Sequence, residues 1–260
     1  MSMAMPAGLG WRLWAPGTLA VALTLAAWEL LGRTGIFNPA LLPAPSVVLA
    51  TLRDIVRDEP FAQPLLRTVG LMAAGYAMAC VAGISLGVAM GRSDAAYRLM
   101  EPLVELVRPI PKPALIPPLF LFLGIGLKTM LFIVALAAFF PMLINTVQGV
   151  RGVDPVLLAT ARTLRLPRMA MVFKIVLPAA MPMVATGLRV SLGLALTLVV
   201  VAEMLAGESG VGFLILDMQR SFQIQKMYAW LVVLAALGLL LNAAFEWAER
   251  QALPWRGHQS

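Results

Sequence analysis

Long apolar runs separated by short polar segments constrain this chain more than any other feature of its sequence. A helix rises 1.5 Å per residue, so about 20 apolar residues cross the roughly 30 Å of hydrocarbon in a bilayer. Because that interior offers backbone amides and carbonyls no other partners, such runs predict helices. The chain is therefore expected to be an all-α, polytopic membrane protein. Its six predicted transmembrane helices cover approximately residues 17–32, 68–91, 100–124, 128–148, 181–205 and 227–247.

The charged residues agree with this class. Only 13% of the 260 residues are charged and 60% are hydrophobic, against about 25% charged residues in an average soluble domain. A net charge of +7 could point to nucleic acid, but the basic residues are scattered between the apolar runs, without a basic and aromatic face. We therefore expect the lipid bilayer as a partner, and no nucleic acid.

Three segments carry more detailed signals. Residues 45–58 place apolar and charged residues at helical spacing, which is typical of an amphipathic helix lying on the membrane surface. Residues 68–91 carry no charge and are rich in Gly, Ala and Ser, which predicts a closely packed helix. The span at 100–124 contains five prolines between 109 and 118, so we expect it to begin irregularly.

Catalytic motifs are missing. The string GISLG at 83–87 fits the nucleophile pattern Gly-x-Ser-x-Gly, but the only histidine that could serve as its base is His258, so helix packing is the better interpretation. The string GIGLKT at 124–129 lacks the glycine spacing of a nucleotide-phosphate loop. There is no Cys/His cluster. We expect a non-catalytic chain that binds no metal and no cofactor itself.

The basic residues also predict an orientation. An even number of spans puts both termini on one side of the membrane. More Lys and Arg residues lie in the segments that are cytoplasmic when the termini are inside than in the opposite segments. We therefore expect cytoplasmic termini, which places the long connection at 149–180 in the cytoplasm.

That connection contains a helix signal. Asp154 followed by Pro155 supplies a capping side chain and then proline at the first helical position, and Pro167 marks a stop. An apolar face can bury itself in a partner's groove or rest on lipid headgroups. Its predicted members are Val156, Leu157, Ala161 and Leu164.

At these residues the sequence resembles the inner-membrane permease subunits of ATP-binding-cassette (ABC) importers. The family pattern is a Glu-Ala-Ala element, a glycine a few residues later and a closing Leu-Pro, and LLATARTLRLP followed by IVLPAAMP matches much of it. Ala159 stands where the glutamate would be, and Arg165 where the glycine would be. The residues in register are Ala161, Arg162, Leu164, Leu177 and Pro178.

The resemblance extends over residues 68–245. Among its strings, RPIPKPALIPPLFLFLGIG and GLRVSLGLALTLVVVAEML look like the branch that imports nitrate, taurine, other sulfonates and some heterocyclic vitamin precursors. It implies the type I ABC importer permease fold in a bacterial inner membrane. It also implies a homodimer of permeases, two ATP-binding subunits that hydrolyse ATP-Mg, and an extracytoplasmic solute-binding protein.

The resemblance divides the chain into three parts. Residues 1–67 form an N-terminal transmembrane helix and the amphipathic surface segment, residues 68–247 form the core permease domain, and residues 248–260 form a cytoplasmic tail. Residues 154–165 become the coupling helix, which sits in a cleft of the ATPase. The expected ATPase contacts are Asp154, Leu157, Leu158, Ala161, Arg162, Leu164 and Arg165.

Three polar residues are candidates for the translocation pathway or its gate. Arg189 lies inside the fifth span, and it either stretches to the inner interface or faces a wet pathway, where it would favour an anionic solute. Glu203 lies near the outer end of the same span, where we expect it to reach water, in a structural role or at a periplasmic gate. Asn145, near the inner end of the fourth span, either hydrogen-bonds neighbouring helices or contacts solute.

The leading hypothesis is a permease that couples ATP hydrolysis in a partner to uptake of a small, anionic solute of the sulfonate, taurine or nitrate class. Uptake of a vitamin-precursor-like solute by the same mechanism is the alternative. A secondary transporter would show internal repeats and acidic residues deep in its spans, and neither is evident here.

Overall fold

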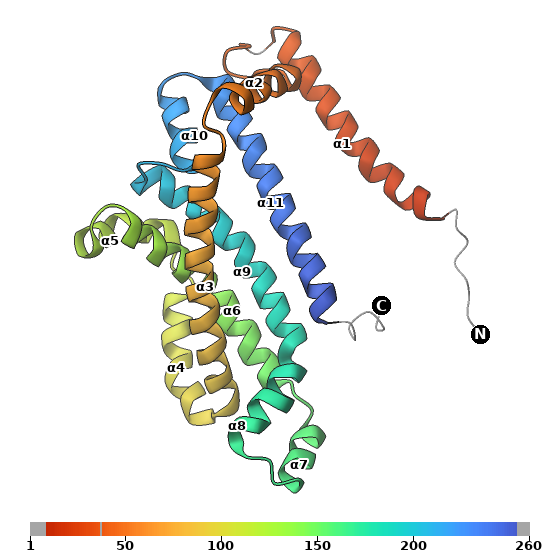
Figure 1. Ribbon diagram of the computed structural model, residues 1–260, viewed down its shortest axis with the longest axis vertical. Coiled ribbons are helices and arrows are strands. Elements are labelled where there is room, and N and C mark those ends of the chain that lie inside the picture. The colour runs from red at the N-terminus through yellow and green to blue at the C-terminus, as the bar shows by residue number, and fades with distance from the viewer. Residues whose placement is uncertain (1–8, 37, 254–260) are drawn as a thin grey trace. The chain divides into compact units, whose positions relative to one another are not determined.

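The computed structural model describes residues 9–36 and 38–253, so residues 254–260 of the predicted tail lie outside it. Every regular element within these residues is helical, as predicted (Figure 1). Two short elements depart from α-helical geometry: η1 is a 3₁₀ turn and η2 is a π-helical segment. The elements are α1 (Leu9–Arg33), α2 (Pro45–Asp58), α3 (Ala62–Arg92), α4 (Asp94–Val107), η1 (Lys112–Leu115), α5 (Ile116–Leu123), α6 (Leu127–Arg151), α7 (Pro155–Thr163), α8 (Arg168–Met171), η2 (Val172–Val176), α9 (Leu177–Ala206), α10 (Val211–Arg220) and α11 (Ile224–Ala252).

Four of the described helical segments are long and apolar enough to cross a bilayer: α3, α6, Met169–Ala206 and α11. They coincide with four of the six predicted spans. The first predicted span lies within α1, a helix of 25 residues. The third predicted span corresponds to a pair of helical pieces, and counting this pair as one span gives five. The described residues thus contain four or five spans by length and composition rather than the six predicted, because α1 is not among the helices that are long and apolar enough.

The third span differs from the prediction of a single crossing with an irregular beginning, because its irregularity lies in the middle. Asp94–Val107 and Lys112–Leu123 meet at 87°. Pro109 and Pro111 occupy the break and leave the last carbonyls of α4 without helical donors. The ammonium of Lys112 donates to the carbonyl of Val107, the last residue of α4, and to the carbonyls of Arg108 and Ile110 in the break, at 2.9, 3.0 and 2.8 Å.

The helices form two compact units. One comprises the chain up to Phe61 together with Ile215–Val232, and the other comprises Ala62–Leu214 together with the chain from Val233 onward. In the first unit, α2 is the helix expected from the amphipathic pattern, and it buries Val48 and Ile55. Its position at a membrane surface remains a prediction.

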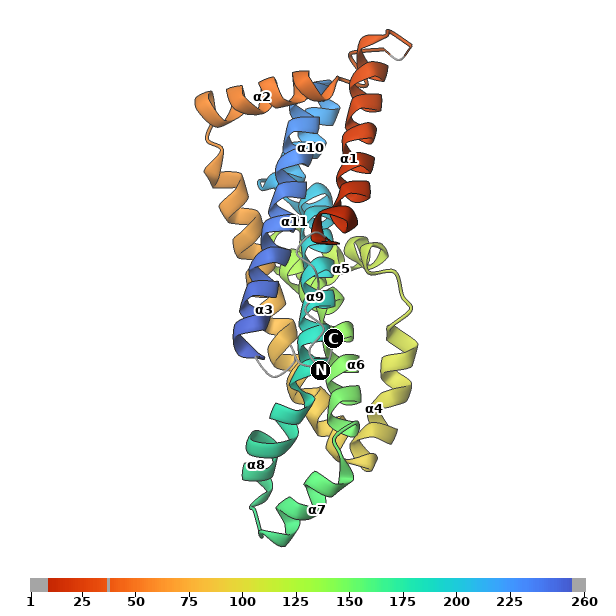
Figure 2. The same cartoon turned by 90° about the vertical axis from the view of Figure 1, so that its right-hand side faces the viewer.

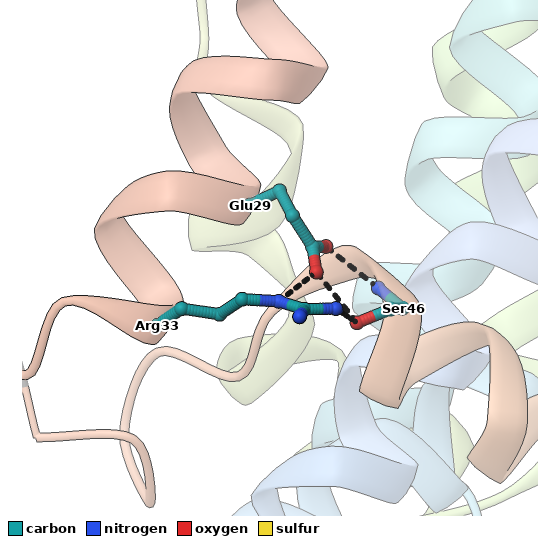
Figure 3. Close-up of polar contacts among 3 residues, drawn as sticks. All are labelled: Glu29, Arg33 and Ser46. Carbon is teal, nitrogen blue, oxygen red and sulfur yellow. Dashed lines mark hydrogen bonds and ion pairs between the residues drawn. The ribbon is translucent and has the colours of Figure 1, made fainter.

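A polar cluster joins α1 to the start of α2 in the first unit (Figure 3). The carboxylate of Glu29 accepts hydrogen bonds from the amide and the hydroxyl of Ser46 at 3.0 and 2.7 Å, and it also pairs with Arg33. A guanidinium nitrogen of Arg33 lies 3.1 Å from the same hydroxyl. This cluster fixes the turn between the two helices.

The second unit is built on three long helices, α3, α6 and α9, which run alongside one another (Figures 1 and 2). Small residues line the contact of α3 with α6. A Cβ atom added at Gly83 would lie 2.9 Å from Cβ of Met142, and one added at Gly87 would lie 2.6 Å from Cβ of Thr146. Backbones can approach this closely only where a side chain is missing. The GISLG string at 83–87 is therefore a helix-packing segment, as interpreted from the sequence.

Candidate coupling helix and pathway residues

The connection between α6 and α9 carries the short helix α7, which lies beyond the ends of these two helices (Figure 1). The carboxylate of Asp154 accepts a hydrogen bond from the amide of Val156 at 2.8 Å, and Pro155 occupies the first turn. This arrangement satisfies one of the amides that a helix start leaves unpaired. The predicted start of a helix at Asp154–Pro155 is confirmed.

The end of α7 shows how Arg165 fits where the family pattern has glycine. Arg165 has φ = +50°, in the left-handed region that glycine adopts most easily. Its amide donates to the carbonyl of Arg162 at 2.9 Å, and the amide of Leu166 donates to the carbonyl of Ala161 at 3.2 Å. These two bonds form a Schellman turn. The left-handed turn is kept, although a non-glycine residue in it costs about 1–2 kcal/mol.

The side chains of α7 divide into an inward and an outward set. Ala161 is 2% exposed, and Leu158 packs against a buried cluster that includes Val150 and Val176. Leu158 thus attaches α7 to the ends of α6 and α9, and Ala161 also lies on the inward side. Three apolar side chains remain exposed on the surface. They are Val156 at 68%, Leu157 at 47% and Leu164 at 68% exposure.

Polar residues accompany the exposed apolar ones. Asp154, Arg162 and Arg165 are all exposed. Ala159, which replaces the glutamate of the family pattern, is exposed too. The outward surface of α7 therefore combines leucine side chains with basic groups. Such a surface suits a groove that is apolar at its floor and acidic at its rim.

Arg189 forms an ion pair that the sequence did not suggest. Its guanidinium binds the carboxylate of Glu246 on α11, which also receives a hydrogen bond from the amide of Asn242 at 3.3 Å. Arg250 approaches the same carboxylate at 3.9 Å. Each side chain of the Arg189–Glu246 pair is about 40% exposed, at 42% and 40%. The charge of Arg189 is compensated within this chain, and no local sequence signal joins residues so far apart.

Glu203 does not reach water as expected from its place near the end of α9. It is 1% exposed, and its carboxylate accepts hydrogen bonds from the hydroxyl of Thr68 and the amide of Gly212, both at 2.9 Å. Gly210, with φ = +107°, lies so close that a Cβ atom there would be 2.2 Å from a carboxylate oxygen of Glu203. The sequence prediction was wrong because the loop at 207–212 folds back over the carboxylate.

Asn145 lies where α6 crosses α9. Its side-chain amide donates to the carbonyl of Pro141 in its own helix at 2.8 Å, and a Cβ atom at Gly187 would lie 2.9 Å from Cβ of Asn145. Arg189 and Glu203 are 203 − 189 = 14 residues apart on α9, which is about 21 Å of helix. The three pathway candidates therefore do not form one site.

The described residues hold no group of three or more His, Cys, Asp and Glu side chains arranged to bind a metal. What the geometry offers is a bundle of long apolar helices with one short, capped helix at its end. This arrangement is that of a helical membrane-spanning protein. Residues 79–253 match the family described as "Binding-protein-dependent transport system inner membrane component", and the chain belongs to this family.

Similar proteins place the chain more finely. It is 32% identical to the putative aliphatic sulfonates transport permease protein SsuC of Bacillus subtilis, over 94% of this chain and 88% of the relative. It is 31% identical to the taurine transport system permease protein TauC of Escherichia coli, over 93% and 89%. It is 29% identical to the nitrate import permease protein NrtB of Leptolyngbya laminosa, over 92% and 88%. The resemblance to this branch of ABC importer permeases is confirmed.

The fold has a solved counterpart. An inward-facing conformation of the MetNI methionine ABC transporter superposes with a TM-score of 0.63 at 21% identity, over 74% of this chain and 95% of that chain. At this identity the likeness concerns the fold alone. It agrees with the expected type I ABC importer permease fold.

Proposed function

We propose that this chain is the permease subunit of an ATP-driven importer, and that it forms part of the pathway for a small, anionic solute of the sulfonate, taurine or nitrate class. Membership of the transport family supports the permease role, and the similarity to permeases named for aliphatic sulfonates, taurine and nitrate supports the solute class. Uptake of a vitamin-precursor-like solute by the same mechanism is the alternative.

The observation that carries the coupling mechanism is the exposed apolar surface of α7. Leu157 and Leu164 stay outside a helix that is capped at both ends. Their burial in the cleft of a partner ATPase would remove apolar area from water. ATP-Mg would be bound and hydrolysed by two such partner subunits, while this chain remains non-catalytic.

The contacts behind α7 support transmission of movement. Leu158 joins the cluster that holds the end of α6 and the start of α9. The glycine-lined contact of α3 with α6 is too close to deform gradually, so it favours movement of these helices as a body. Closure of the ATPase around α7 would therefore move the long helices together.

The remaining partners and the orientation belong to the same proposal. The importer would contain a second permease copy, as a homodimer, and would receive solute from an extracytoplasmic binding protein. The membrane would be the bacterial inner membrane, with α7 and both termini in the cytoplasm. The excess of basic residues in the corresponding segments supports this orientation.

Copurification tests the coupling contact. The tagged chain, coexpressed with its ATPase subunit, should retain that subunit in mild detergent, and Leu164→Asp should release it. Ala95→Asp is the matched control, because Ala95 is exposed in the first turn of α4, where an acidic side chain is favourable. Retention of the ATPase by Leu164→Asp, or transport by the chain without any ATPase, would contradict the proposal.

Uptake competition tests the solute class. Vesicles containing the assembled importer should take up labelled solute in an ATP-dependent manner, and ethanesulfonate, taurine and nitrate should compete with that uptake. Competition by a heterocyclic vitamin precursor alone would favour the alternative.

A further inference from the structure

A hollow of about 620 Å³ opens in the second unit, at the start of α3 and the end of α9. These helix ends lie at the end of the bundle opposite α7 (Figure 1). Its walls come from the start of α3, the turn between α5 and α6, and the loop that follows α9. This volume lies within the range of small-molecule sites, about 300–1,000 Å³. The floor is apolar and includes Leu71, Ala74, Met130 and Leu131.

Three charged residues line this hollow, and only one of them is basic. Arg67 is exposed, and its guanidinium donates a hydrogen bond to the hydroxyl of Ser209 at 2.6 Å. The carboxylate of Glu203 is already occupied by Thr68 and an amide. Glu208 is exposed at the rim. A guanidinium that faces a hollow and is bound to a neutral hydroxyl has most of its capacity for anions left.

The hydrogen bond of Arg67 is not needed to hold the loop. The neighbouring Thr68 binds the loop by itself, because its hydroxyl accepts a hydrogen bond from the amide of Val211 at 2.9 Å. The carboxylate of Glu203 binds the amide of Gly212. The loop at 207–212 is therefore fixed to α3 and α9 through buried contacts, and the exposed Arg67–Ser209 bond can be exchanged.

We propose that the hollow is a binding subsite for an organic anion, in which Arg67 exchanges the hydroxyl of Ser209 for the anionic group of the solute. The planar guanidinium matches two oxygens of a sulfonate or a carboxylate. The hydrocarbon part of the solute lies on the apolar floor, a contact that nitrate lacks. The inference rests on the proposed function and selects the organic class of solutes over nitrate.

The acidic residues that line the hollow strengthen the preference for organic anions over nitrate. Glu203 and Glu208 both line the hollow and oppose an anion, so an anion must gain enough from Arg67 and from the apolar side chains to remain bound. Burial of two carbon groups contributes about tenfold in affinity, and nitrate has none. Ethanesulfonate should accordingly bind at least about tenfold more tightly than nitrate.

Saturation-transfer NMR on the purified chain in nanodiscs tests the subsite, with ethanesulfonate as the probe and nitrate as a competitor. The ethyl protons should receive saturation from the wild-type chain. Arg67→Gln should weaken binding by about tenfold or more, because a hydrogen bond to a charged group is lost. Arg67→Lys, which keeps the charge without the planar fork, should weaken it less. Arg220→Gln removes a basic side chain outside the hollow and is the matched control.

Ser209→Ala separates a binding role from a structural one. If Arg67 binds the solute, this variant keeps the probe signal, since only the exchangeable partner is lost. An equal loss in Ser209→Ala and Arg67→Gln would overturn the inference, as would the absence of a signal in the wild-type chain or equal binding of nitrate. Probe binding without any ATP-driven uptake would contradict the proposed function but would still support the binding subsite.

Discussion

Gly87→Ala tests the packing of α3 against α6 at the point where Gly87 lies against Thr146. The added Cβ atom would lie 2.6 Å from Cβ of Thr146, 2.8 Å from its Cγ2 and 3.1 Å from the carbonyl oxygen of Leu143. Carbon atoms in contact prefer about 3.5–4.0 Å. The two helices would have to separate by roughly 1 Å, because Thr146 is fully buried and cannot move aside.

The expected magnitude follows from a comparison within α3. Overpacking of a close-packed core costs about 1–3 kcal/mol. Gly70→Ala adds the same methyl group to the same helix with no atom within 4 Å, so the gain in helix propensity cancels between the two variants. Gly87→Ala should therefore be about 1–3 kcal/mol less stable than Gly70→Ala. At roughly 2–4 °C per kcal/mol for a chain of this size, the midpoint should fall by about 2–12 °C.

The single cysteine provides the assay. Cys80 is partly buried in α3, so a fluorogenic thiol reagent reports the unfolding of that helix during a thermal ramp in detergent. A Gly87→Ala variant as stable as Gly70→Ala would refute the described contact of α3 with α6.

Three smaller perturbations test the site residues. Arg165→Gly should relieve the left-handed turn and stabilise the end of α7 by about 1 kcal/mol, which hydrogen exchange of the α7 amides would detect as slower exchange; faster exchange would argue against the turn. Glu203→Ala should cost roughly 1–3 kcal/mol, because it leaves the Gly212 amide unpaired while the Thr68 hydroxyl keeps the carbonyl of Pro64 as an acceptor. Glu203→Gln keeps an acceptor for that amide and should cost less in the same thermal assay; equal costs would contradict the described network. For the Arg189–Glu246 pair, a double-mutant cycle to alanine should give a coupling free energy of about 0.2–1 kcal/mol, as for partly exposed ion pairs. A coupling free energy of zero would contradict a stabilising role of this pair.

Local and periodic signals predicted much of the fold. Apolar length located four spans that appear as single long helices, since the hydrocarbon thickness fixes the helix length. The Asp154–Pro155 pair located the start of α7, because a cap acts within three residues. The small residues of α3 predicted close packing, and the contacts of Gly83 and Gly87 follow from that composition.

Features that depend on distant residues were not predictable in this way. The 87° break in the third span is set by Pro109 and Pro111 together with the lysine that satisfies the freed carbonyls, so proline content alone did not place it. The burial of Glu203 depends on a loop that returns over it, and the pairing of Arg189 depends on α11. Position along a helix gives the depth of a side chain, but it does not give the partner.

ATP-dependent uptake tests directly whether α7 transmits the action of a partner ATPase to this permease. Vesicles containing the chain, its ATPase subunits and the solute-binding protein would be supplied with labelled ethanesulfonate, with and without ATP. If α7 couples the two subunits, accumulation depends on ATP, Leu164→Asp abolishes it and Ala95→Asp preserves it, with all three chains inserted equally. Accumulation that is independent of ATP, or that survives Leu164→Asp, would contradict it.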